Sequence, residues 1–385
     1  MIQLTELEQV LCQAIACGAR RPNELAQKFV DAMGEDAAWA FADQNEIAPH
    51  LAHALHGESV HSAGDRWSKA HQQTQSRIQS YLNELDRVSA ELDRDSIQVI
   101  ALKNAGITRG LYDCPGCSPM GDLDILVRPA DFRRAHRFLL DDGYEFEFRS
   151  ELEENDLAAA EKSGGAEYWK ILSNGEKLWL ELQWRPVAGR WIQPDQEPAA
   201  DDLFARSKPM DGTQVRLMAP EDNLLQVALH TAKHSYVRAP GFRLHTDVDR
   251  IVSRETVDWD RFLRTACDLQ VKGAIYYSLI IPRKVFGTEI PDQVLNSLRP
   301  SNGRDRRMWA AIQKAGLFNP DERKFSKIGY ILFSIMMYDD LKGLSRGVFP
   351  PADWMSEKYG CKNRAALSYG YARRIFDLLT RRSQT

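Results

Sequence analysis

The spacing of apolar residues divides the chain into three stretches of different pattern. From residue 1 to about residue 95, apolar residues recur at helical spacing, and Thr5 stands where an N-terminal helix cap is expected. The longest helical segment, 66–95, carries one apolar stripe formed by Ile78, Leu82, Leu85, Val88 and Leu92. Its remaining positions are polar, so one face is predicted to pack and the rest to be solvated.

A strand-rich stretch follows. Its short apolar and β-branched runs are typical of strands, and Asn174-Gly175 between the last two is a strong hairpin signal. The predicted strands are 96–103, 122–127, 166–172 and 177–184. A helix ended by Gly143 is expected between the second and third strands. After a proline-containing connection, the pattern from residue 216 onward is again helical.

This order predicts an α+β fold with a mixed β-sheet core and helices. We expect an N-terminal helical region over 1–95, an α/β core over 96–215 and a C-terminal helical domain over 216–385. A chain of 385 residues is long for one hydrophobic core, which agrees with more than one unit.

Composition narrows the function classes. The chain has 50 basic and 54 acidic residues and a formal net charge of −4, so we do not expect a long nucleic acid as partner. No apolar run approaches the roughly 20 residues that a membrane helix needs. The first residues lack the basic start of a secretory signal, and the six cysteines are scattered, so a cytoplasmic, reduced protein is expected.

Two clusters of metal-ligand residue types stand near the N-terminal half. Cys114 and Cys117 form a C-x-x-C sequence, but the other four cysteines supply no second such pair, so we expect a turn with two incidental thiols. A run of four histidines with no accompanying carboxylates is expected at the surface: His50, His53, His56 and His61.

An acidic pair interrupts the second predicted strand. Side chains alternate along a strand, so Asp122 and Asp124 project from one face while Leu123 lies on the other. Two such close carboxylates repel each other, and a hard cation such as Mg²⁺ removes the conflict. Glu181 lies within the apolar run 177–184, where an unpaired charge is costly, and supplies a third carboxylate for a metal site.

The ordered series IALKNAGI, SPMGDLDILV, LELQW, APEDNLLQVALHTAKHSY and FPPADWMSEKYG resembles the uncharacterised nucleotidyltransferase family of the polymerase-β-type nucleotidyltransferase superfamily. The resemblance spans about residues 40 to 360. It implies a nucleotidyltransferase-type core and a Mg²⁺-dependent enzyme that moves a nucleoside monophosphate from a nucleoside triphosphate to an acceptor hydroxyl or phosphate and releases pyrophosphate. ATP is the expected donor, and a small molecule or peptide the expected acceptor.

The resemblance also implies roles for single residues. Asp122, Asp124 and Glu181 would be the catalytic residues and the ligands of two ions, magnesium or alternatively manganese, and Glu181 could also act as general base. The residues implied to contact the nucleotide are Lys103, Asn104, Ser118, Gly121, Lys233 and His234.

The chain departs from the family pattern at three positions. Asn104 stands where the family has glycine, Ser118 where it has arginine, and Gln183 where it tends to have histidine. Without that arginine, a cationic phosphate clamp would have to come from elsewhere in the chain. The candidates are Arg109, Arg128 and Lys170.

Other functions stay open at this point. None of the three departures removes a metal ligand, so an active enzyme with altered substrate handling is expected. Asn104 and Ser118 leave a non-catalytic member that binds a nucleotide or a partner as an alternative. D-x-D alone also occurs in glycosyltransferases, which would need a βαβ unit upstream. His230 and His234 have metalloprotease-like spacing but lack the general-base glutamate, which excludes that class. For five further residues, two interpretations remain open, a role in helix packing and a position beside the site: His230, His234, His245, Asp247 and Asp249.

Overall fold

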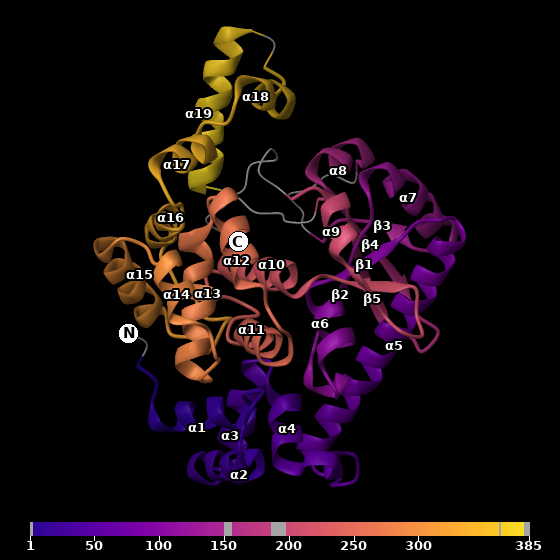
Figure 1. Cartoon of the computed structure of the whole chain (residues 1–385), viewed down its shortest axis with the longest axis vertical. Helices are drawn as coiled ribbons and strands as arrows, with labels where there is room; N and C mark the ends of the chain where they lie inside the picture. The colour runs from indigo at the N-terminus through magenta and orange to yellow at the C-terminus, as the bar shows by residue number, and fades with distance from the viewer. Residues whose placement is uncertain (1–2, 150–155, 186–197, 362, 381–385) are drawn as a thin grey trace.

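A seven-stranded mixed sheet lies on one side of the molecule, on the right in Figure 1. The computed structural model describes residues 3–149, 156–185, 198–361 and 363–380. The strand order is β3-β4-β5-β2-β1-β7-β6. The strands are β1 (Val99–Leu102), β2 (Asp122–Leu126), β3 (Glu145–Phe146), β4 (Gly165–Ile171), β5 (Lys177–Gln183), β6 (Lys208–Pro209) and β7 (Val215–Leu217).

The pairing of β2 with β5 sets up the chemistry of the sheet. These two strands run parallel, with Asp124 opposite Glu181, whereas β1 pairs with β2 antiparallel. Leu123 and Ile125 are fully buried on one face, so the acidic residues of β2 project from the other, as the alternation predicts. The β4–β5 hairpin turns at Asn174-Gly175, and Gly175 has the positive φ of 85° that the dipeptide indicated.

Helices precede the sheet, as predicted. α1 begins with the expected Thr5 cap, in a capping box with Glu8. The helices are α1 (Glu6–Ile15), α2 (Pro22–Met33), α3 (Glu35–Gln44), α4 (Ala48–His56) and α5 (Arg66–Arg94). The apolar stripe of α5 is buried against the face of the sheet that carries Leu123 and Ile125. The face with the acidic residues is therefore left to other elements.

Three helices lie along the chain between or beside the strands: α6 (Lys103–Leu111) directly after β1, α7 (Phe132–Asp141) after β2, and α8 (Leu157–Ser163) before β4. α9 (Ala200–Arg206) follows β5 and packs with β1 and β2 on the acidic face through Leu203 and Phe204. The sequence did not predict α9, β3, β6 or β7 as separate elements, because they are short and carry no clear periodicity. The first residues of the proline-containing connection lie outside the described residues.

The C-terminal part is helical, and α6, α10 and α11 lie between it and the sheet (Figure 1). Its helices are α10 (Pro220–Lys233), α11 (Arg243–Arg254), α12 (Trp259–Asp268), α13 (Lys272–Val285), α14 (Asp292–Leu298), α15 (Asn302–Ala315), α16 (Lys327–Met336), α17 (Leu341–Val348), α18 (Ala352–Tyr359) and α19 (Arg364–Thr380). None of the described helices is both long and apolar enough to cross a bilayer.

The buried side chains form two large clusters. One joins α5, α7 and the sheet, and the other joins α1–α4 with α10–α16. The helices before the sheet are thus shared between the two clusters, with α5 belonging mainly to the sheet. The observed α+β architecture with a mixed sheet confirms the predicted fold class.

Candidate functional site

Asp124 and Glu181 lie side by side on the acidic face of the sheet. The parallel register places them opposite each other, and the Lys103 ammonium joins them, with its Nζ 2.5 Å from Asp124 Oδ1 and 3.1 Å from Glu181 Oε2. Gln183 Nε2 donates a further hydrogen bond of 3.0 Å to Asp124 Oδ1. Two of the three predicted catalytic acids and one predicted phosphate contact therefore meet at one point.

Lys103 reaches this point from an unusual backbone conformation. It is the first residue of α6, immediately after β1, and its φ of 47° lies in the left-handed region. Its N–H donates to Gln226 Oε1 at 3.3 Å. A non-glycine residue in this region costs about 1–3 kcal/mol and persists only where its surroundings hold it. The ion pairs of the side chain and the bond to Gln226 are such surroundings.

Burial and charge shift the three pKa values in different directions. Burial raises the pKa of Asp124 well above its usual value, more than Lys103 lowers it. Burial also opposes ionisation of Glu181, but the Lys103 ammonium and a hydrogen bond with Asp124 bring its pKa well below the usual range. The two carboxylates raise the pKa of Lys103 despite its burial. Lys103 stays charged, and Glu181 is the partner that stays ionised.

Asp122, at the start of β2, is paired with another cation. Arg149 Nη2 lies 2.7 Å from Asp122 Oδ2, and Arg149 Nε lies 3.1 Å from Glu167 Oε2. The guanidinium also lies over the ring of Trp179, 5.5 Å from its centroid. In the part of the chain that the structure describes, the three predicted carboxylates do not close around one point, since Asp122 is turned toward Arg149.

The donor set at this face suits a hard divalent cation. Among the described residues, these linked ion pairs contain four carboxylates, of Asp122, Asp124, Glu167 and Glu181, and two cations, of Lys103 and Arg149. The side chains of Asp122 and Glu181 keep 21% and 26% of their surface exposed, so both can be reached from solvent. Carboxylate oxygens in excess of local positive charge are what Mg²⁺ or Mn²⁺ binds.

The C-terminal turn of α10 lies beside these carboxylates. Lys233 contributes to the lowered pKa of Glu181, and Lys103 to the lowered pKa values of both histidines of the helix. The rings of His230 and His234 lie 4.7 Å apart, and burial lowers the pKa of His234 to about 4. The predicted contact residues Lys233 and His234 thus lie on the site side of α10, with His234 neutral.

The other predicted nucleotide contacts differ in their surroundings. Asn104 Oδ1 accepts a hydrogen bond of 3.5 Å from Arg243, and the Ser118 hydroxyl is buried and bonded to Thr108 at 2.6 Å. Gly121 is exposed, and a Cβ added there would meet no atom within 4 Å. Only Gly121 of these three offers open space beside β2.

The expected replacements for the missing arginine are engaged elsewhere. Arg109 pairs with Asp86, Arg128 with Asp201, and Lys170 with Asp142. The arginine that does lie at the carboxylates is Arg149, beside Asp122 and Glu167, and the sequence did not predict it. It lies after β3, far from the other site residues in sequence, and no motif marks it.

The histidine interpretations need two corrections. His53 is half-buried, so it is not a surface residue, and the two thiols that were expected to be incidental lie close to two imidazoles, those of His53 and His71. His50 is also half-buried, and burial lowers its pKa to about 3. The predicted surface location was wrong because their helix packs against the loop that carries the cysteines.

For His245 and Asp249, the contacts agree with the helix-packing interpretation. His245 is fully buried, with Nε2 hydrogen-bonded to the Tyr236 carbonyl at 2.9 Å. Asp249 accepts hydrogen bonds from the Cys17 N–H and the Thr288 hydroxyl. Both serve packing between helices.

Comparison with known proteins points to one family. No curated protein matches the chain. Among solved structures, the chain is similar to that of an antigenic nucleotidyltransferase-like protein from Paracoccidioides brasiliensis. The two sequences are 13% identical, and the match covers 56% of this chain and 96% of that chain with a TM-score of 0.36. The family described as "uncharacterised nucleotidyltransferase" matches residues 31–287, two thirds of the chain. The protein therefore belongs to the uncharacterised nucleotidyltransferase family.

Proposed function

We propose that the protein is a Mg²⁺-dependent nucleotidyltransferase that transfers a nucleoside monophosphate from ATP to an acceptor. Membership of the family supports a nucleotidyltransferase function in general. The single observation that carries the specific proposal is the meeting of Asp124 and Glu181 at the Lys103 ammonium on the acidic face of the sheet. A lysine and paired carboxylates at one point are the groups that hold a triphosphate and its metal ions.

In this proposal the three acids bind the metal ions and Lys103 binds the phosphates. Asp122, Asp124 and Glu181 would hold the two metal ions, which would supply charge neutralisation for the triphosphate and lower the pKa of the acceptor hydroxyl. Lys103 would move from the carboxylates to a phosphate oxygen, because a bound triphosphate offers the same ammonium a more highly charged partner. Positioning of the donor against the acceptor would then supply most of the catalysis.

Glu181 is also the candidate general base. While Lys103 contacts it, its pKa is too low for it to take a proton. Movement of Lys103 to the phosphates would remove that cation from Glu181, while a metal ion held by the same carboxylate would keep its pKa low. As general base, Glu181 would therefore take a proton from an acceptor hydroxyl whose own pKa is lowered by the metal ions.

The arginine and the α10 residues complete the proposed donor site. Arg149 would serve as the phosphate clamp in place of the arginine missing at Ser118, since it already lies at Asp122. Lys233 and His234 would contact the phosphates from the end of α10, and Gly121 leaves room for the donor. Asn104 would act through Arg243 instead.

The net charge and the cysteines bear on the acceptor and on the cellular location. A small molecule or peptide suits the near-neutral net charge better than a long nucleic acid does. All six cysteines are free thiols, which suits a reducing, cytoplasmic setting.

Two alternatives make different predictions. A non-catalytic member would bind ATP through Lys103 and would not turn it over. The pairing of Lys103 with both Asp124 and Glu181 in this structure is compatible with that alternative. A glycosyltransferase needs a βαβ unit upstream, and the described residues before β1 are helical. That arrangement leaves the non-catalytic reading as the stronger of the two alternatives.

The test follows the label of ATP. Wild-type protein with Mg²⁺ and size-fractionated cell extract is expected to move label from α-labelled ATP to an acceptor, but not from γ-labelled ATP. Asp124→Asn and Glu181→Gln should each lower this transfer on the order of 100-fold or more. The control Asp292→Asn, at an exposed residue of α14 that pairs with Arg283, should keep wild-type activity. Transfer of γ label alone would mean kinase chemistry, and ATP binding without any transfer would support the non-catalytic alternative.

A further inference from the structure

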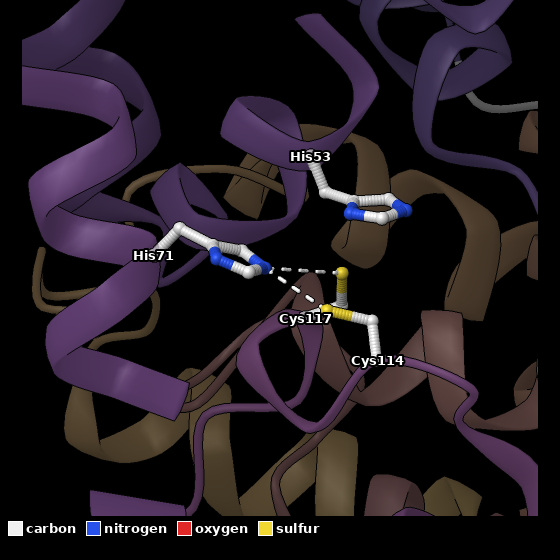
Figure 2. A group of neighbouring side chains, drawn as sticks. All are labelled: His53, His71, Cys114 and Cys117. Atoms are coloured by element: carbon white, nitrogen blue, oxygen red, sulfur yellow. Dashed lines mark hydrogen bonds between the residues drawn. The ribbon is translucent and has the colours of Figure 1, made fainter. Parts of the chain in front are cut away.

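A second cluster of side chains lies away from the carboxylates. His53 comes from α4 and His71 from α5, while Cys114 and Cys117 lie at the short 3₁₀ turn Pro115–Cys117 between α6 and β2. Figure 2 shows all four side chains pointing toward one another. One ligand atom from each residue lies within 4.8 Å of every other. Three elements of the fold therefore direct two imidazoles and two sulphurs to one point.

The distances fit a tetrahedral metal site. Zinc binds sulphur at about 2.3 Å and imidazole nitrogen at about 2.0–2.1 Å, so its ligand atoms lie roughly 3.3–3.8 Å apart. His71 Nε2 is 3.0 Å from Cys114 Sγ and 4.0 Å from Cys117 Sγ. The observed separations bracket the required ones, and small side-chain rotations would bring the four atoms to bonding distance.

The surroundings of the cluster also suit a bound ion. His71 is fully buried, and Cys117 is 4% exposed. The buried Nδ1 of His53 has no hydrogen-bond partner among the described residues, although a buried polar atom normally has one. A metal ion at the centre of the cluster would give such an atom a partner.

Gly116 shows how closely the turn fits the imidazole. A Cβ at this position would lie 2.5 Å from His71 Nε2, the same nitrogen that contacts both sulphurs. Only glycine lets the turn approach the ring so closely. The C-P-G-C sequence therefore has a geometric reason at each cysteine and at the glycine between them.

We propose that His53, His71, Cys114 and Cys117 bind one zinc ion in a closed, structural site. All four positions of a tetrahedron are filled by the protein, so no open position is left for a substrate. The ion would join α4 and α5 to the loop that leads, through residues 118–121, to Asp122. It would thus hold the start of β2 in place, independently of whether the carboxylate site carries out nucleotidyl transfer.

The first test is the metal content of the full-length wild-type protein. After purification and dialysis without chelator, elemental analysis should find about one zinc per chain. In metal-free protein, added Co²⁺ should give the intense visible bands of tetrahedral cobalt and a thiolate charge-transfer band in the near ultraviolet. Metal-free wild type that shows neither band, or a Cys114–Cys117 disulfide in protein purified under reducing conditions, would overturn the proposal.

Variants assign the ion to these residues. The double variant Cys114→Ser/Cys117→Ser should retain less than about a tenth of the wild-type zinc, because it loses both sulphur ligands. Cys267→Ser, at an exposed cysteine, is the matched control and should bind zinc like the wild type. Gly116→Ala should weaken zinc binding with both thiols intact. Undiminished zinc in the double variant would contradict the assignment, and if that variant does not fold, the wild-type and Gly116→Ala measurements still decide.

Discussion

At the scale of the residue, strand alternation was the most informative signal. It predicted that Asp122 and Asp124 share a face and that Glu181 joins them, and the structure brings Asp124 and Glu181 together. It could not predict that Lys103 bridges the two acids, because that contact depends on how α6 leaves β1. The sequence also did not predict that Arg149 contacts Asp122, or that His53 and His71 lie beside Cys114 and Cys117. In both cases the partners lie far apart in the sequence.

Replacement of Lys103 by methionine tests the buried charges. Without the ammonium, the buried Asp124 and the half-buried Glu181 would lie side by side with no cation between them, so Lys103→Met should lower the free energy of unfolding by about 3 kcal/mol in metal-free buffer near pH 8. Burial raises the native pKa of Asp124 above its unfolded value, so the protonated form is favoured by folding and stability is lost as the pH rises.

The loss should therefore be smaller near pH 5 than near pH 8, as measured by urea unfolding. Lys69→Met, at an exposed lysine of α5, is the control and should change stability little at either pH. An equal loss at both values of pH would contradict the assigned protonation.

His245 gives a pH dependence of opposite sign. Burial lowers its native pKa to about 4, against about 6.5 when unfolded, so the unfolded chain binds the extra proton and stability is lost as the pH falls below about 6.5. His245→Gln keeps a donor for the Tyr236 carbonyl but cannot titrate. Between about pH 7.5 and pH 5, the variant should lose about 2 kcal/mol less of unfolding free energy than the wild type. Parallel urea-unfolding curves at both pH values measure this difference, and an identical loss in both proteins would contradict a neutral, buried His245.

At the scale of the element, the long periodic segments were predictable and the short ones were not. The apolar stripe of α5 and the β4–β5 hairpin were confirmed, because each is specified by its own residues. β6 and β7 were missed because two or three residues carry no period, and β7 exists through its pairing with β1. The edge of the sheet beyond β1 is thus set by tertiary contacts.

Gly106 tests the packing of α6 against β1. A Cβ here would lie 2.6 Å from the Ala101 carbonyl oxygen, so Gly106→Ala should displace α6 and cost about 1–3 kcal/mol. Because α6 begins at Lys103, nucleotidyl transfer should fall as well, even at temperatures where the variant stays folded.

The matched control is Gly303→Ala in α15, where an added Cβ meets no atom within 4 Å. It should be neutral or stabilise by up to about 1 kcal/mol, because alanine favours helix more than glycine does. Thermal unfolding of both variants measures the difference. Equal stability of Gly106→Ala and wild type would show that α6 can move away from β1 without cost.

At the scale of the whole molecule, two clusters of buried side chains organise the chain. The predicted ranges 1–95, 96–215 and 216–385 stay a prediction, but the clusters cross them: α5 packs on the sheet, while α1–α4 pack with the C-terminal helices. Periodicity shows which face of a helix is apolar and does not show which partner covers it. This is why the sequence could give helices for both ends of the chain but not their common core.

Two fragments test this arrangement. The fragment 96–215 lacks α5 and leaves the sheet face around Leu123 and Ile125 uncovered, so it should aggregate or show no cooperative unfolding. The fragment 65–217 keeps α5 and all of β7, and should be soluble with a cooperative thermal transition. Circular dichroism and gel filtration of both measure the outcome. A cooperative, monomeric 96–215 would show that the sheet does not depend on α5.

The central claim is that the carboxylates on the acidic face of the sheet receive the triphosphate and that Lys103 moves to it. The most direct measurement is a crystal structure of the protein with Mg²⁺ and an ATP analogue that resists cleavage between the α- and β-phosphates. We predict metal ions at Asp122, Asp124 and Glu181, the α-phosphate beside them, and Lys103 Nζ on a phosphate oxygen. A nucleotide bound away from β2 and β5, with Lys103 still joining Asp124 to Glu181, would contradict the account.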